Sequence, residues 1–247
     1  ARAVGTSLQP WFIFANCDML MFLSEQVKTK ECFDMPISRR TVSGWALAGL
    51  ASSLLPGPSA FADAAKYAPI RKGDGQFGSY TQPWFLESFL EFADDIEEAA
   101  GNGKRFALMW ELEGCPYCRE THLVNFAVPE INEYVRANFE IVQLDLKGSR
   151  EVVNFDGTPM KERDLARLNR VRHTPTIQFF PETVDELKGK IGKDMEIARM
   201  PGYLRPFHFY TYFQFVREKA YTHTNFHKYL SARVANYKAE GKQLPSW

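Results

Sequence analysis

The chain has 247 residues, which is enough for one or two domains. Apolar residues make up 45% of it and charged residues 24%, a composition that excludes a disordered, collagen-like or mainly coiled-coil chain. Basic and acidic residues both number 30, so the formal net charge is zero and we expect no binding to nucleic acid through bulk charge. Four cysteines are too few for a disulfide scaffold.

Residues 35–62 have the pattern of an export signal. The adjacent Arg39 and Arg40 precede an apolar run over residues 45–55 and a small-x-small sequence that ends at Ala62. The paired arginines resemble those of a twin-arginine signal, with an ordinary secretory signal as the alternative. The apolar run is shorter than the roughly 20 residues needed to span a membrane. We therefore expect cleavage near Ala62 and a periplasmic protein.

The remaining chain divides by composition. Residues 1–34 form an upstream extension to which the sequence assigns no role. Residues 63–80 contain several glycines and are predicted to be a flexible lead-in. A globular domain is predicted over residues 81–236, followed by a solvated tail over residues 237–247.

Hydrophobic periodicity predicts alternating helices and strands across the globular domain. An amphipathic helix is predicted over residues 83–100, and the apolar run over residues 105–112 indicates a buried central strand. Further helices are predicted over residues 116–127, 129–137 and 158–169, from residue 206 onward, and over 225–236, and further strands over 139–146, 176–180 and 195–200. The first strands alternate with helices, which implies parallel pairing, whereas the last two follow each other and imply an antiparallel pair. We expect an α/β fold with a small mixed central sheet and helices on both faces.

Cys115 and Cys118 are the only cysteines after the predicted export signal. They lie in the sequence Gly-Cys-Pro-Tyr-Cys-Arg, between the buried strand and the next predicted helix. Cys115 therefore lies at a helix N-terminus, where free N–H groups and the helix dipole stabilise a thiolate and lower the thiol pKa below its free value of about 8.5. Because the pair closes too small a loop to stabilise the fold much, redox chemistry is favoured over an inert structural disulfide.

A second landmark is Thr174-Pro175-Thr176, directly before a predicted strand. With the cysteine pair, it resembles the thioredoxin superfamily, in which a cis proline at this step faces the two cysteines. Pro201-Gly202-Tyr203, between the last strand and the helix after it, is a third match. The resemblance covers about residues 77–229 and implies a thioredoxin-like fold.

The subgroup that the chain resembles is the SoxW-like exported thioredoxins of bacterial sulfur-oxidation systems. This resemblance implies a thiol–disulfide oxidoreductase that reduces protein disulfides, with Cys115 as nucleophile and Cys118 as resolving thiol. The residues implied to line the substrate groove are Pro116, Tyr117, Thr174 and Pro175. No cofactor is implied. The implied partners are a disulfide-containing client protein and a membrane thiol transporter that donates electrons, and the chain is expected to be a monomer.

The sequence departs from cytosolic thioredoxins at two positions. Gly114 stands where they have Trp before the first cysteine, and Met109 stands where they have a buried Asp. The sequence leaves open whether Glu111 or Glu113 takes over proton transfer from that Asp. An oxidase or isomerase of the DsbA or DsbG kind, in the same fold, also stays open.

A third class of function is a non-enzymatic metal carrier. His122 follows Cys118 by four residues, so the two side chains share a helix face, and His173 could complete a set of cysteine and histidine ligands with Cys115. Covalent haem attachment is excluded because Arg119, rather than His, follows the second cysteine.

Overall fold

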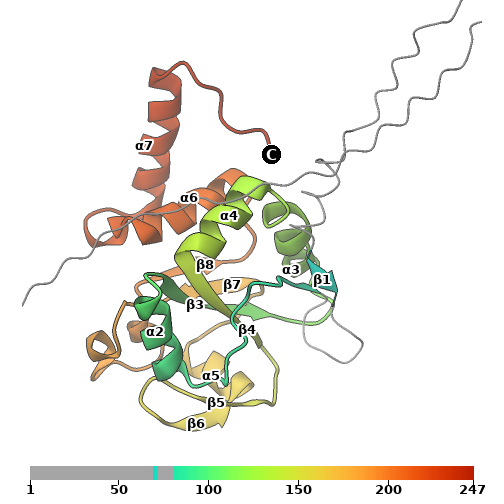
Figure 1. Ribbon diagram of the computed structural model, residues 1–247, viewed down its shortest axis with the longest axis vertical. Helices are drawn as coiled ribbons and strands as arrows, with labels where there is room; N and C mark the ends of the chain where they lie inside the picture. Colours follow the sequence, from blue (N-terminus) through green and yellow to red (C-terminus); the bar gives the residue numbers. More distant parts are fainter. Residues whose placement is uncertain (1–68, 72–79) are drawn as a thin grey trace, which may run out of the picture. The chain divides into compact units, whose positions relative to one another are not determined.

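The fold is built around a four-stranded sheet in the computed structural model, which describes residues 69–71 and 80–247. Its strands are β3 (Arg105–Glu111), β4 (Phe139–Asp145), β7 (Thr176–Phe179) and β8 (Ala198–Pro201), in the order β4–β3–β7–β8 (Figure 1). β3 is hydrogen-bonded on both sides, and every one of its residues is buried. The apolar run after residue 104 thus forms the predicted central strand.

The sheet is mixed. β3 and β4 run parallel, whereas β7 runs antiparallel to β3, and β8 runs antiparallel to β7. In register, Leu108 of β3 lies between Val142 of β4 and Gln178 of β7. The predicted parallel first half and antiparallel last pair are confirmed.

Helices cover both faces of the sheet, as predicted (Figure 1). They are α2 (Phe92–Gly101), α3 (Pro116–Glu120) with its π-helical continuation η1 (Thr121–Asn125), α4 (Pro129–Asn138), α5 (Glu162–Leu168) and α6 (Pro206–Arg217). Side chains alternate along a strand, so β3 serves two cores. Ala107 and Met109 pack with α4 and α6, and Leu108 and Trp110 pack with α2 and α5.

The helix predicted over residues 83–100 is wrong in its first half, because α2 begins only at Phe92. Leu90 has a left-handed backbone with φ of 67°, through which a right-handed helix cannot continue. The Leu90 carbonyl instead accepts a hydrogen bond from the N–H of Val153 (2.8 Å). As a result Phe89, predicted on the buried face, is 98% exposed.

The segment between β4 and α5 forms a hairpin that the sequence analysis did not predict. It consists of β5 (Glu151–Val153) and β6 (Pro159–Lys161). The buried carboxylate of Glu162 accepts a hydrogen bond from the guanidinium of Arg150 (2.5 Å). A Cβ atom at Gly148 would overlap this carboxylate, so the close approach requires glycine. α5 consequently begins after the hairpin, later than predicted.

The buried guanidinium of Arg105 ties the start of β3 to the C-terminal part of the chain. It forms an ion pair with Glu182 (2.9 Å) and donates a hydrogen bond to the hydroxyl of Tyr221 (3.0 Å). Glu182 lies just before the short helical turn η2 (Val184–Leu187), and Tyr221 lies in the turn η4 (Ala220–Thr222). A further short turn, η3 (Gly192–Met195), follows η2 in the sequence. The charge is thereby paired although it is buried.

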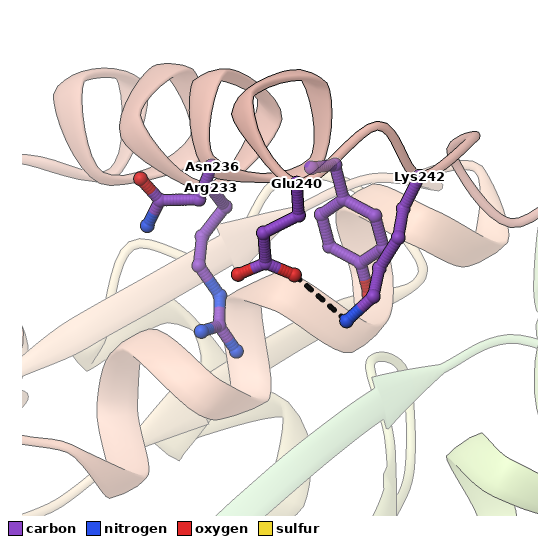
Figure 2. A pocket seen from close by; sticks show the side chains of 5 residues that line it. Arg233, Asn236, Glu240 and Lys242 are labelled. Atoms are coloured by element: carbon purple, nitrogen blue, oxygen red, sulfur yellow. Dashed lines mark ion pairs between the residues drawn. The ribbon is translucent and has the colours of Figure 1, made fainter.

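The last helix, α7 (Phe226–Ala239), has no buried residue and extends away from α6 (Figure 1). At its C-terminal end lies a polar cavity of about 240 Å³ (Figure 2). Its lining residues are Arg233, Asn236, Tyr237, Glu240 and Lys242. The tail predicted over residues 237–247 is not wholly solvated, because the half-buried Trp247 packs edge-on against Tyr210 with ring centroids 6.0 Å apart.

A short strand pair begins in the predicted flexible lead-in over residues 63–80 and ends at Thr81. β1 (Ile70–Arg71) pairs antiparallel with β2 (Tyr80–Thr81). The predicted extension over residues 1–34 and export signal over residues 35–62 lie outside the described residues. In the part of the chain that the structure describes, no helix is both long enough and apolar enough to cross a membrane.

Asp95 is a buried carboxyl group on α2. Burial raises its pKa to about 6; a hydrogen bond from Ser88 opposes this rise, and nearby carboxylates add to it. Because the pKa is higher in the folded than in the unfolded chain, the fold binds this proton more tightly. The stabilisation of the fold by the protonated Asp95 is complete below about pH 4 and is lost as the pH rises through about 6.

We predict that Asp95→Asn raises the free energy of unfolding at pH 7.5 by about 2 kcal/mol, since it removes a buried charge. The loss of stability between about pH 4 and 7 should become shallower in this variant. Urea unfolding across this pH range measures both effects. The exposed Asp94→Asn is the matched control, and an equal response of the two variants would contradict the assignment.

Candidate active site

The cysteine pair lies at the junction of β3 and α3. Gly114 turns the chain with a φ of 74°, a conformation that favours glycine. The N–H of Cys115 then donates to the carbonyl of Leu112 (3.1 Å), and Pro116 opens α3. Cys115 is therefore the residue directly before a helix, as the sequence predicts.

Cys115 and Cys118 are joined by a disulfide, and their Cα atoms are 5.3 Å apart. Cys118 is only 3% exposed, whereas Cys115 is half-buried. The backbone N–H of Cys118 donates to the sulfur of Cys115 (3.1 Å). Solvent and partner molecules therefore reach the sulfur of Cys115 more readily than that of Cys118.

The Thr174–Pro175 step faces Cys115, and its peptide bond is cis, as the resemblance implied. The Thr174 hydroxyl donates to Cys115 Sγ (3.3 Å), and the Thr174 carbonyl oxygen lies 3.5 Å from the same sulfur. In the reduced protein, a thiolate at Cys115 has two donors at hand, this hydroxyl and the N–H of Cys118. Hydrogen bonds to the charged form favour that form.

Tyr117 is 59% exposed between the two cysteines. Its ring is stacked on that of Tyr203, with centroids 5.9 Å apart and planes 18° apart. Tyr203 follows Gly202, whose N–H donates to the carbonyl of Pro175 (2.7 Å). The sequence Pro201-Gly202-Tyr203 resembles the superfamily but does not indicate that Tyr203 lies in the site, because the stack joins positions that are far apart in the sequence.

A buried polar pair lies behind the cysteine helix. Glu111, the last residue of β3, is fully buried and bonded to Nε2 of His122 in η1 (2.8 Å). The other ring nitrogen of His122 contacts the side-chain amide of Gln82 (3.1 Å). Glu113, the alternative to Glu111 in the sequence analysis, is exposed. Of the two glutamates, only Glu111 is buried behind the site.

Further amides extend this pair into a network. The side chain of Gln143 in β4 donates to the second oxygen of Glu111 and to the carbonyl of Tyr80 (2.9 Å). Asn132 of α4 donates to Gln82 (3.3 Å). The network therefore links β3, β4, two helical segments and the chain that precedes α2. A buried charge that is paired and hydrogen-bonded in this way is far less costly than an isolated one.

The two histidines proposed as metal ligands lie in different settings. Both ring nitrogens of His122 are occupied by Glu111 and Gln82, so this side chain is not free to join the cysteines. His173, which directly precedes the Thr174–Pro175 step, is exposed. Over residues 69–71 and 80–247, no group of three or more His, Cys, Asp and Glu side chains is arranged to hold a metal ion.

Comparison with known proteins identifies the family. The thioredoxin-like domain family matches residues 92–217, about half of the chain. A thioredoxin-fold protein from Helicobacter pylori is 22% identical, over 55% of this chain and 83% of that chain, with a TM-score of 0.43. A thioredoxin from Thermus thermophilus is 21% identical, over 51% and 83% of the two chains, with a TM-score of 0.38. No curated protein matches the sequence.

The chain belongs to the thioredoxin-like domain family. Its α/β architecture is the thioredoxin-like fold, as the sequence analysis predicted. The family and the Cys115–Cys118 disulfide together support thiol–disulfide oxidoreductase chemistry in general.

We predict that Glu111→Ala lowers the free energy of unfolding by about 3 kcal/mol, because it leaves the buried His122 and Gln143 without their shared partner. Urea denaturation of the oxidised protein measures the change. The exposed Glu113→Ala is the matched control and should change stability by less than about 0.5 kcal/mol. Equal effects of the two variants would show that the buried network does not hold the site in place.

Proposed function

We propose that the protein is an exported thiol–disulfide oxidoreductase that reduces disulfides of client proteins. The observation that carries the proposal is the arrangement around Cys115. This half-buried cysteine lies directly before a helix, is disulfide-bonded to a buried cysteine and accepts a hydrogen bond from Thr174. This arrangement offers a nucleophile to a partner and keeps the second thiol within reach.

The first step is the attack of the Cys115 thiolate on one sulfur of a client disulfide. A bond forms between Cys115 Sγ and that sulfur, the client disulfide breaks, and the second client sulfur leaves as a thiolate that takes up a proton. The N–H of Cys118 and the hydroxyl of Thr174 stabilise the attacking anion. The backbone of Thr174 can pair with an extended client segment as an added strand.

The second step resolves the mixed disulfide. Cys118 loses its proton and attacks the sulfur of Cys115, which releases the first client sulfur as a thiol. Two electrons and two protons have then passed from the enzyme to the client, and the enzyme holds the Cys115–Cys118 disulfide. We propose that a membrane thiol transporter supplies the electrons for the next cycle, that the protein acts as a monomer and that it needs no cofactor.

We predict that Cys115→Ser lowers the rate of insulin reduction by dithiothreitol to the rate measured without protein, because it removes the attacking sulfur. Cys118→Ser should instead accumulate a mixed disulfide with the client, since resolution is blocked. Turbidity of precipitating insulin and non-reducing electrophoresis measure the two effects. Full activity of Cys115→Ser would reject the proposal.

The direction of electron flow is decided by the reduction potential of the pair. A value near that of thioredoxin, about −270 mV, fits a reductase, and a value near that of DsbA, about −120 mV, fits an oxidase. Equilibration with glutathione buffers followed by alkylation gives this value. We propose the reductase, in keeping with the SoxW-like resemblance and a role in bacterial sulfur oxidation.

We propose that residues 35–62 export the protein to the periplasm by the twin-arginine route, with cleavage near Ala62. The support is the pair Arg39 and Arg40 ahead of a short apolar run. Replacing both arginines with lysine should retain the full-length precursor in the cytoplasm, as measured by fractionation. Unchanged export of that variant would favour an ordinary secretory signal.

A further inference from the structure

The surface beside Cys115 carries an aromatic platform. It consists of the exposed Tyr117 and of Tyr203, whose ring is stacked on that of Tyr117 with the two planes 18° apart. Tyr203 is tied to the Thr174–Pro175 step through Gly202. Two aromatic rings from separate segments are thus stacked on each other beside the segments that carry the cysteine pair and the Thr174–Pro175 step. Stacked rings of this kind bind a further aromatic side chain well.

Three exposed arginines lie within a few residues of the platform or of the Thr174–Pro175 step in the sequence. Arg119 lies one helical turn after Cys115 and donates its N–H to the Cys115 carbonyl (3.2 Å). Arg172 is exposed two residues before Thr174. Arg205 is exposed two residues after Tyr203. None of the three guanidinium groups forms an ion pair or hydrogen bond with any residue in the described part of the chain.

Two glutamates offset part of this positive charge. Glu113 is exposed just before the cysteine pair, and Glu120 lies half-buried at the end of α3. Burial raises the pKa of Tyr203, and Glu120 adds to the rise while Arg205 opposes it, so both charges act on the platform. Three arginines against two glutamates leave a surplus of one positive charge.

We propose that the preferred client segment is acidic and carries an aromatic residue next to the reactive cysteine. This inference rests on the proposed function and adds the chemical class of its substrate. The aromatic residue stacks on Tyr117 and Tyr203, and carboxylates of the client pair with Arg119, Arg172 and Arg205. Complementary charge accelerates encounter and loses its effect as salt screens it.

The test uses the reduced full-length chain and synthetic peptides with one intramolecular disulfide of fixed loop length. The peptides carry Glu, Lys or Ser residues around the disulfide, and Tyr or Ala next to the reactive cysteine. Rapid mixing followed by acid quench and chromatography gives the second-order rate constant of peptide reduction. At low salt we expect the acidic peptide to react about fivefold or more faster than the basic one, and this ratio to approach one at high salt.

Charge reversal identifies the arginines responsible. Arg172→Glu combined with Arg205→Glu should bring the ratio of acidic to basic rate constants below one. Arg136→Glu, an exposed arginine in the last turn of α4, is the matched control and should leave the ratio unchanged. Because the readout is a ratio measured on one protein sample, a partial loss of folded protein does not change it.

The aromatic part has its own variants. Tyr203→Ala should remove the preference for Tyr over Ala in the peptide, and Tyr203→Phe should restore it, since the ring and not the hydroxyl makes the stack. The inference would be overturned if the wild-type protein reduced all the peptides at the same rate, whatever the salt concentration, the peptide charge or the aromatic residue. Reduction of the neutral peptide would then still support the proposed function. Failure to reduce even the neutral peptide would reject both.

Discussion

The hydrogen bond between Glu111 and His122 is the contact on which the arrangement of the site depends. Glu111 ends the central strand, and His122 lies in η1, the continuation of the helix that contains Cys118 and begins directly after Cys115. Because both side chains are buried, neither can exchange its partner for water without disrupting the core. The position of the cysteine helix relative to the sheet is thus fixed by a polar contact as well as by apolar packing.

The second side of the site is fixed independently. Pro175 accepts a hydrogen bond from Gly202, and Thr174 contacts the sulfur of Cys115. These residues border β7 and β8, the antiparallel part of the sheet, whereas the cysteines follow β3. The reactive sulfur therefore lies where the parallel and antiparallel parts of the sheet meet, and each part supplies one wall.

The parts of the structure that the sequence predicted depend on local patterns. The apolar run of β3, the spacing of Cys115 and Cys118 and the Thr174–Pro175 step each lie within a few neighbouring residues, so their order predicted the sheet and brought attention to the site. The prediction of a helix before residue 92 is wrong because the Leu90 carbonyl accepts a hydrogen bond from Val153, more than 60 residues later in the chain. The local periodicity of the sequence gives no information about so distant a partner.

The same limit applies to the site itself. The Tyr117–Tyr203 stack and the Glu111–His122 bond join residues whose sequence neighbourhoods give no sign of each other. The sequence singled out Glu111 and His122 as chemically interesting, one as a proton carrier and the other as a metal ligand. Only their burial together shows that they are partners, because burial is a property of the folded chain.

The buried guanidinium of Arg105 has a consequence for how far the chain can be shortened at its two ends. One of its partners, Tyr221, lies beyond the segment that matches the family, and Gln82, which contacts His122, lies ahead of that segment. A chain shortened to residues 92–217 would remove the Tyr221 hydroxyl from the buried guanidinium of Arg105. It would also remove the Gln82 amide from one ring nitrogen of His122. On both sides, therefore, the polar contacts that satisfy buried groups of the domain extend beyond the residues that match the family.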